Sequence, residues 1–363
     1  MLTSLSLIFL VGLVMGAICQ KLKLPRIIGM LLTGIVLGPY VLDFLDPSIL
    51  SISADLRKMA LIIILIKAGL SLDLKDLKKA GRSAILMSFI PASCEIICYI
   101  LLAPVILGIN HAEAAVMGAV LAAVSPAVVV PRMVMLIEKR YGTDKAIPQM
   151  ILSGASCDDI FVIVLFTTFL NVAQGGRANV MDFVNIPVSI ILGIILGLVT
   201  GLGLYLFFET SYARKHTVRN SMKVIIVLGF SFLLIAIEGW LWLAAEVILF
   251  VLVGAAVDIR YTLKAGLPAL LMILAALVFR AAGVLLCTVK TNLTWKERLF
   301  CVIAYLPKAT VQAAIGSVPL AAGLACGQIV LSVAVLAIIV TAPLGAIGID
   351  CTYKRLLKED KTH

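Results

Sequence analysis

The chain has 363 residues, of which 62% are hydrophobic and only 14% are charged, and its formal net charge is +10. Soluble domains are typically about 45–50% apolar and about 25% charged, so this composition excludes a soluble enzyme and indicates a polytopic protein embedded in the lipid bilayer. The basic residues lie mostly in short loops between apolar runs, without a long basic tail or interleaved aromatic residues. The positive charge therefore does not indicate nucleic-acid binding.

Apolar runs of about 20 residues are long enough to cross a bilayer as helices, and the sequence contains twelve of them. Short linkers join the runs, so residues 1–363 are expected to form one integral membrane domain of an all-α fold. No charged segment precedes the first run, which we interpret as a span rather than a signal peptide. The runs lie at 2–20, 27–44, 55–72, 83–108, 113–137, 146–170, 183–208, 220–238, 240–257, 265–288, 298–323 and 325–349.

The distribution of Lys and Arg predicts the orientation. The loops after the first, third, fifth and seventh runs are rich in basic residues, whereas those after the second, fourth and sixth carry Arg177, with Arg57 and Lys58 at a helix entry. Basic loops remain in the cytoplasm. We therefore expect the N-terminus outside, in a cell membrane of the bacterial inner-membrane type.

The sequence resembles itself at an offset of 185 residues, and this offset places Glu95 opposite Arg280, each central in its apolar run. Past them, each half contains a run interrupted by proline, at Pro126 and at Pro307. Internal repeats with interrupted helices in matching positions are typical of secondary transporters. The aligned residues also include Gly69 with Gly254, Asp73 with Asp258, and Lys79-Ala80-Gly81 with Lys264-Ala265-Gly266.

Eight charged residues lie in the interior of the apolar runs, more than three residues from either end. A charge at the centre of a transmembrane helix costs about 2.5–3.5 kcal/mol on insertion scales, so such residues are functional candidates by default. Two of them lie toward the cytoplasmic ends of their runs and are expected to extend to the interface, and the sequence gives no account of Glu246. The eight are Lys67, Glu95, Arg132, Asp158, Asp159, Glu246, Arg280 and Lys308.

Asp158 and Asp159 are the most informative pair. Adjacent residues of a helix point about 100° apart, so one carboxylate can face a cavity while the other faces neighbouring helices. Two like charges this close oppose each other's ionisation, and a carboxylate can then hold either a proton or a hard cation such as Na⁺ or Li⁺. Competition between the two is sufficient for antiport. The alternative is a structural pair bound to Arg or Lys.

Glu95 and Arg280 are predicted to form a buried salt bridge. Lys308 follows Pro307 in an interrupted run, where it either neutralises exposed carbonyls and half-helix dipoles or takes a direct part in the ion site. The other interruption begins at Ser125-Pro126. Carbonyls freed there are candidates to coordinate a cation, with a simple proline kink as the alternative.

No resident metal, cofactor or catalytic residue is expected. The chain has eight cysteines without a C-x-x-C pair and three distant histidines, a pattern that favours core-filling cysteines over a metal site. An intramembrane aspartyl protease needs two aspartates on different helices, whereas Asp158 and Asp159 are adjacent. The chain is therefore not expected to be an enzyme.

Three motifs together resemble the monovalent cation:proton antiporter superfamily, and within it the sodium/hydrogen exchanger 9B-like branch. They are Asp158-Asp159, the run from Ser125 to Pro131, and Leu306-Pro307-Lys308-Ala309-Thr310-Val311-Gln312-Ala313-Ala314-Ile315-Gly316. The resemblance covers nearly the whole chain. It implies two inverted repeats with two crossed, discontinuous helices, which would be the runs holding Ser125 and Lys308.

The resemblance also implies roles and a domain division. Asp159 resembles the main ion and proton carrier with Asp158 beside it, and Glu95 with Arg280 resembles the buried acid–base pair of this superfamily. Core helices would lie within residues 83–170 and 265–349. Scaffold helices within 1–72 and 183–257 would form a homodimer.

The chain departs from this superfamily near Trp240, where two runs join almost without a loop and a segment of about 30 to 40 residues, one span with its connection, is missing. Inverted repeats require equivalent helices to differ by an odd number in order, but the repeat pairs the third run with the ninth. One more helix before Trp240 would remove the conflict. Alternatively, residues 220–257 do not form two ordinary spans, although one helix of that length would reach about 57 Å.

The sequence therefore predicts a Na⁺(Li⁺)/H⁺ antiporter that works by alternating access. Two alternatives remain open: a Na⁺-coupled solute symporter of related architecture, and an antiporter inactivated by the deletion.

Overall fold

The computed structural model describes residues 1–22, 24–53, 56, 74–175, 191, 195, 197–210, 226, 251–256 and 266–360, with the backbone alone for 74–80. Within these residues the secondary structure is helical, apart from one isolated bridge between Tyr141 and Glu359. The predicted all-α class is confirmed for this part of the chain.

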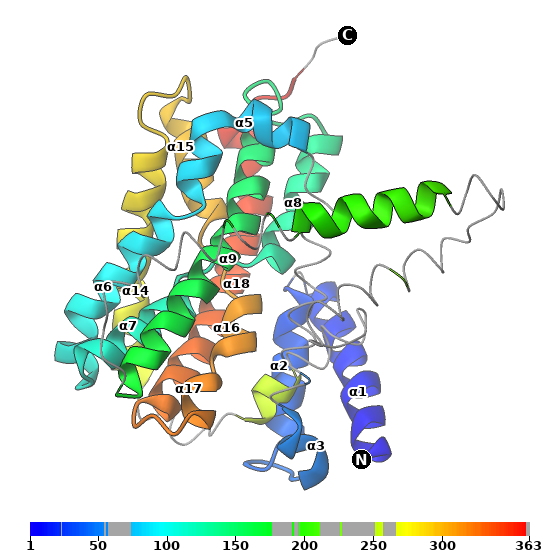
Figure 1. Cartoon of the computed structure of the whole chain (residues 1–363), viewed down its shortest axis with the longest axis vertical. Coiled ribbons are helices and arrows are strands. Elements are labelled where there is room, and N and C mark those ends of the chain that lie inside the picture. Colours follow the sequence, from blue (N-terminus) through cyan, green and yellow to red (C-terminus); the bar gives the residue numbers. More distant parts are fainter. Residues whose placement is uncertain are drawn as a thin grey trace.

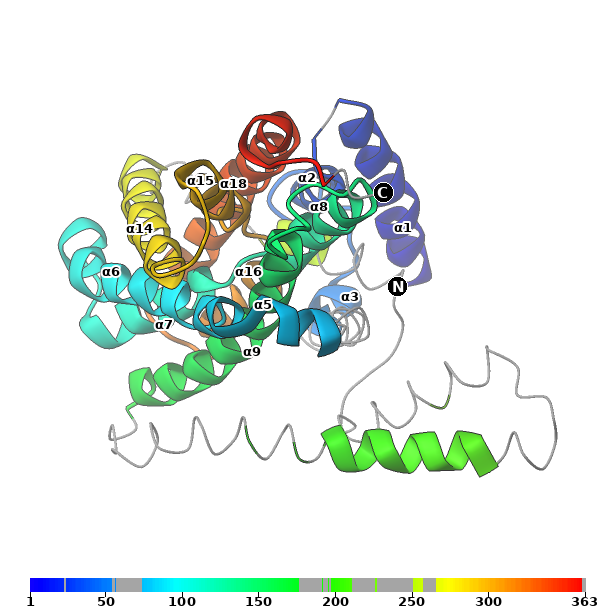
Figure 2. The ribbon, with the colours of Figure 1, turned by 90° about the horizontal axis from the view of Figure 1, so that it is seen from above.

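The helices form a bundle of α5–α9 and α14–α18, with α1–α3 beside it (Figures 1 and 2). Short helical stretches also cover residues 197–210 and 251–255. The bounds are α1 Leu2–Lys21, α2 Arg26–Leu37, α3 Pro47–Ser51, α5 Leu74–Met87, α6 Ile90–Leu107, α7 His111–Ala122, α8 Pro126–Glu138, α9 Ile147–Ala173, α14 Gly266–Cys287, α15 Trp295–Ala304, α16 Thr310–Ile315, α17 Val318–Ala321 and α18 Gly327–Leu356.

Six helical segments in the described ranges are long and apolar enough to cross a membrane, which agrees with the expected multi-pass architecture. The prediction at 27–44 was too long, because α2 ends at Leu37. Gly38 precedes Pro39 and takes an extended conformation, as residues before proline do. The six segments are Leu2–Lys21, Gly81–Leu107, His111–Glu138, Ile147–Ala173, Gly266–Cys287 and Gly327–Leu356.

Several predictions lie outside the described residues. These include nearly all of the runs at 55–72 and 220–238, most of the run at 240–257, and part of the run at 183–208. Lys67 and Glu246 lie there too, as does most of the loop through which the internal repeat was aligned.

The two predicted interruptions are breaks in helical structure. Helix α7 ends at Ala122 and α8 starts at Pro126, and α15 ends at Ala304 and α16 starts at Thr310. Proline favours the first position of a helix and excludes the preceding residue from helical geometry, which explains the extended Ser125 before Pro126. The first break is therefore an interruption with extended backbone rather than a simple kink.

Polar contacts gather three loops at one end of the bundle. Lys145 Nζ lies 2.7 Å from Glu297 Oε2, the Gly142 N–H donates to Lys358 O at 2.8 Å, and the Asp360 N–H donates to Arg140 O at 2.8 Å. These bonds place the start of α9, the loop before α15 and the segment after α18 together. Helix α14 ends in that same loop, so α9 starts and α14 ends at the same end.

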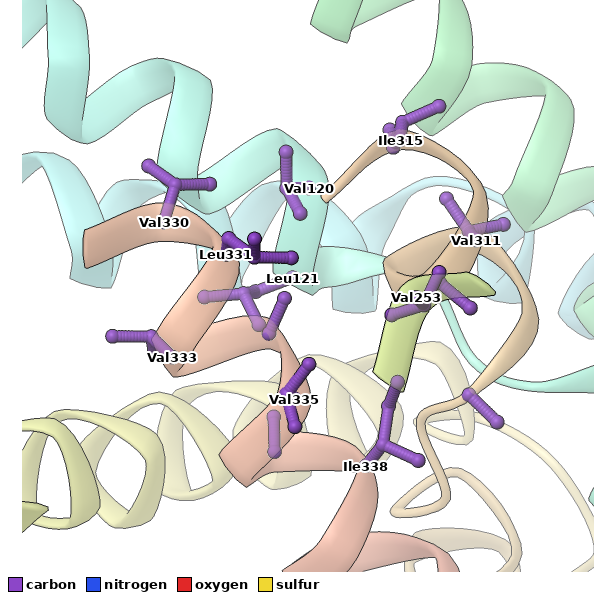
Figure 3. Packing of buried hydrophobic residues seen from close by; sticks show 14 of the residues in the cluster. Val120, Leu121, Val253, Val311, Ile315, Val330, Leu331, Val333, Val335 and Ile338 are labelled. Atoms are coloured by element: carbon purple, nitrogen blue, oxygen red, sulfur yellow. The ribbon is translucent and has the colours of Figure 1, made fainter. Parts of the chain in front are cut away.

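Helix α18 packs against the helix before the first break and is hydrogen-bonded to the second break. Its buried apolar residues Val330, Leu331, Val333 and Ile338 pack in one cluster with Leu121 of α7 (Figure 3). One turn further on, the Thr341 hydroxyl accepts a hydrogen bond from the Lys308 N–H at 3.0 Å. The second break therefore rests on a continuous helix.

Glycine allows α1 and α2 to pack closely. A Cβ atom placed on Gly29 of α2 would overlap the backbone of Met15 and Gly16 in α1. Close approach of two helices through small residues is a common packing mode in membranes.

We predict that Gly29→Ala destabilises the protein by about 1–3 kcal/mol, because the added methyl forces the two helices apart. Thermal unfolding of the detergent-solubilised protein measures the effect. Gly266→Ala is the matched control, since a Cβ atom there meets nothing within 4 Å. Equal stability of the two variants would contradict the packing argument.

Candidate ion-binding site

The site is built around the end of α7 in the interior of the bundle. The last carbonyls of a helix have no partner within that helix, and here side chains from elsewhere bind them. Lys308 Nζ donates to Leu121 O at 2.6 Å, and Gln312 Nε2 donates to Leu121 O at 3.3 Å and to Ala123 O at 2.9 Å. Lys308 lies in the second break and Gln312 in α16 directly after it, so the two breaks contact each other.

Arg280 of α14 connects four other elements. Its Nη1 donates to Glu95 Oε2 of α6 at 2.9 Å and also to Ala122 O. Its Nη2 donates to Asp158 Oδ2 of α9 at 3.0 Å, and its Nε donates to Tyr305 O at 2.7 Å. The two carbonyls are at the ends of α7 and α15, so one guanidinium caps both interrupted helices.

Glu95 also binds Lys308, so its charge is shared by two cations. Lys308 Nζ lies 2.7 Å from Glu95 Oε1 and 2.8 Å from Oε2. All three side chains, Glu95, Arg280 and Lys308, are fully buried. The sequence left two roles open for Lys308: binding exposed carbonyls, or a direct part in the ion site. The structure gives a direct contact for the first, from Lys308 Nζ to Leu121 O.

Asp158 holds the start of α8. Its Oδ2 accepts a hydrogen bond from the Val124 N–H at 2.9 Å as well as the bond from Arg280. A carboxylate near a helix N-terminus is favoured by the helix dipole, and Val124 directly precedes the N-cap Ser125. The sequence left the partner of Asp158 open, and Arg280 occupies that position.

Asp159 is different from its neighbour. It is fully buried, and within the described part of the chain neither carboxylate oxygen has a hydrogen-bond partner. In the network around it, Arg280 and Lys308 balance the charges of Glu95 and Asp158. An ionised Asp159 is therefore a surplus negative charge in a buried place, which is unfavourable unless a proton or a cation joins it.

Ser125 joins the breaks through its backbone, since its N–H donates to Pro307 O at 2.8 Å. Its buried hydroxyl has no partner in the described structure. The same holds for the Thr310 hydroxyl and for the carbonyl oxygen of the Gln312 amide. These neutral oxygens are of the type that hard cations prefer.

Sequence reasoning overlooked three contributors: Gln312, Tyr305 and Thr341. Gln312 and Tyr305 are in or next to the motif at the second break, but neutral side chains and backbone carbonyls carry no insertion penalty that singles them out. Arg132, in the middle of α8, forms two bonds of 3.0 Å with Asp350 of α18. In the described ranges, no cluster of His, Cys, Asp and Glu is suited to a resident metal ion.

Comparisons with known proteins connect this geometry to one family. Residues 5–241 and 239–354 match the family described as "Sodium/hydrogen exchanger, transmembrane". The chain is 32% identical over 390 residues to human sodium/hydrogen exchanger 9B2, which covers 93% of this chain and 70% of that protein. It is 31% identical over 409 residues to mouse sodium/hydrogen exchanger 9B1, which covers 99% and 72%.

The fold resembles that of the sodium proton antiporter MjNhaP1 from Methanocaldococcus jannaschii at pH 8, with a TM-score of 0.78 over 97% of each chain. Sequence identity is 18%, so this likeness concerns the fold. The alignment with human 9B2 is longer than the part of this chain that it uses, because 93% of 363 residues is about 338. About 50 aligned positions thus have no counterpart here, and the family match divides at Trp240.

We predict that Arg280→Gln destabilises the protein by about 3–5 kcal/mol, because it leaves buried charges without their partner. Arg132→Gln is the matched control. It removes a partly exposed ion pair with Asp350, for which a loss of about 0–1 kcal/mol is typical. Thermal unfolding in detergent compares the two, and similar losses would contradict the central position of Arg280.

Proposed function

This chain belongs to the sodium/hydrogen exchanger family, and we propose that it exchanges Na⁺ or Li⁺ for H⁺ across a membrane through Asp159. One observation carries the assignment of the residue: Asp159 is the buried carboxylate whose oxygens have no partner among the described residues, beside an ion network that is balanced without it. Such a group is stable only when it holds a proton or a cation.

Exchange follows from competition at this carboxylate. On one side of the membrane Na⁺ or Li⁺ displaces the proton from Asp159, and on the other side a proton displaces the cation. Because each state neutralises the surplus charge, both loaded states have a low energy in the apolar interior. The empty ionised state does not, so unloaded movement is disfavoured and transport of the two ions is coupled.

The residues around Asp159 hold the helix ends at the site in place. Asp158 and Arg280 fix the start of α8 and the ends of α7 and α15. Lys308 and Glu95 add a second link between the breaks. Ser125 and Lys308 are thus proposed as supporting residues, and Glu95 with Arg280 as the buried ion pair that holds the framework.

We assign the transporting core to helices within 83–170 and 265–349, and the scaffold to those within 1–72 and 183–257. The contact between the two breaks, from Ser125 N to Pro307 O, supports the two crossed, discontinuous helices of inverted repeats. In this arrangement the core moves against a scaffold that forms a homodimer within the bilayer.

The number of spans is constrained by the loops that share one end of the bundle. Helix α9 starts and α14 ends at that end, so an even number of crossings must lie between Ala173 and Gly266. The predicted runs at 183–208, 220–238 and 240–257 are three. We propose that the number of crossings in this interval is even, so that the twelve predicted spans are not all present as separate crossings, and that a segment carried by its relatives is missing at Trp240, in a region outside the described residues.

The basic loops at the end shared by Lys145 and Lys358 favour a cytoplasmic location for that end. The N-terminus is then outside, in a cell membrane of the bacterial type. A Na⁺-coupled solute symporter is not favoured, since the relatives found are exchangers.

We predict that Asp159→Asn abolishes exchange, because an amide neither releases a proton nor balances a cation. The measurement is collapse of a pH gradient by Na⁺ or Li⁺ in everted vesicles at matched membrane levels. Asp350→Asn is the control, with the same chemical change at an exposed carboxylate. Exchange at full rate in Asp159→Asn would overturn the assignment, and no exchange in the parent would favour an antiporter inactivated by its deletion.

We predict that the two termini lie on opposite sides of the membrane. Twelve crossings would place them on the same side, whereas an even number of crossings between Ala173 and Gly266 gives an odd total. Epitope tags at Met1 and His363, probed with protease in intact and permeabilised cells, measure this. Accessibility of both tags in intact cells, or of neither, would refute the even number.

A further inference from the structure

The Gln312 amide has an orientation that its partners fix. Both acceptors of its nitrogen, Leu121 O and Ala123 O, are carbonyl oxygens, and carbonyls are bound only by the NH₂ end of an amide. The side chain is fully buried in α16. Gln312 therefore links the helix after the second break to the backbone of the first break.

Gln312 and Asp158 hold opposite sides of the same peptide unit. The carbonyl of Ala123 accepts the bond from Gln312 at 2.9 Å, and the N–H of the following residue, Val124, donates to Asp158 Oδ2 at 2.9 Å. A peptide unit is planar and rigid. Fixing its carbonyl therefore also fixes the direction of its N–H, and with it the position of the carboxylate that receives that N–H.

We infer that Gln312 is a positioning residue for cation binding, acting through the Ala123–Val124 peptide on the Asp158-Asp159 pair. The other side-chain links to the end of α7 come from Arg280 and Lys308, which are cations and respond to any change of charge at the site. The Gln312 amide is neutral. It holds the extended backbone in the same place whether Asp159 carries a proton or a metal ion.

The side-chain length of Gln312 is part of this role. Asparagine is one methylene shorter and does not reach both carbonyls from the same backbone position. Glutamate has the same length but would add a negative charge beside the aspartates, whereas methionine is neutral, unbranched and of similar length, with no N–H donor. Leucine has a similar volume and no donor. Comparing variants with these side chains therefore separates the effect of losing the N–H donor from the effect of changing the packing.

The experiment compares Gln312→Leu, Gln312→Met and the parent in everted vesicles, with the Li⁺ concentration for half-maximal exchange and the maximal rate measured separately. We expect the half-maximal concentration to rise roughly tenfold in both variants, because two hydrogen bonds that hold the site are lost. The maximal rate per folded molecule changes much less. Gln149→Leu is the matched control, a buried glutamine on α9 about 13 Å along the helix from Asp158.

A lower maximal rate with an unchanged half-maximal concentration would overturn the inference, since that result means that Gln312 only stabilises the fold. If the leucine variant reaches the membrane poorly, Gln312→Met decides, because methionine keeps an unbranched, neutral side chain of similar length and lacks only the N–H donor.

The inference rests on the proposed function. Measurements on the parent protein distinguish a failure of the proposed function from a failure of the inference about Gln312. Li⁺-dependent thermal stabilisation of the purified parent, absent in Asp159→Asn, reports binding without transport. A parent that neither binds nor exchanges Li⁺ would overturn both the function and the inference. A parent that binds Li⁺ no more tightly than its Gln312 variants would overturn the inference alone.

Discussion

The buried guanidinium of Arg280 is the interaction on which the rest of the site depends. Two helices stop in the interior of an apolar bundle, and each leaves carbonyls that water cannot reach. Arg280 binds one carbonyl from each, Ala122 O and Tyr305 O, and uses its remaining donors on Glu95 and Asp158. Its charge is favourable at both helix ends, because the C-terminal end of a helix dipole is negative. The breaks and the buried carboxylates therefore stabilise each other.

This arrangement gives the two adjacent aspartates different surroundings. Asp158 points toward α8 and α14 and is held by a backbone N–H and a guanidinium. Asp159, about 100° around the helix, has no such partner in the described structure. A fixed charge and an unbalanced one thus come from two consecutive residues. The fixed one organises the backbone, and the unbalanced one is the carboxylate that we propose binds the exchanged ions.

The sequence was sufficient to predict much of this site. Charged residues inside apolar runs carry a large energetic penalty, so Asp158, Asp159, Glu95, Arg280 and Lys308 stood out without any structure. Which of the two aspartates is held by Arg280 depends on the rotation of α9, which hydropathy does not encode. Gln312 and the carbonyls of Ala122 and Tyr305 gave no signal, because neutral groups reveal a role only through their partners. The length of α2 was overestimated because an extended Gly-Pro step is as apolar as the helix before it.

The described contacts of the ion site do not involve the region around Trp240, where the family match divides. Every contact described for the site lies within residues 95–158, within residues 280–341, or between these two ranges. The charged side chains of the proposed core therefore all come from outside residues 176–265. Alternating access needs more than this site, because the core must move against a scaffold that takes up the displacement. Loss of a scaffold segment would leave cation binding intact while it slows or stops exchange, so binding and exchange measured on the same protein locate the effect of the deletion.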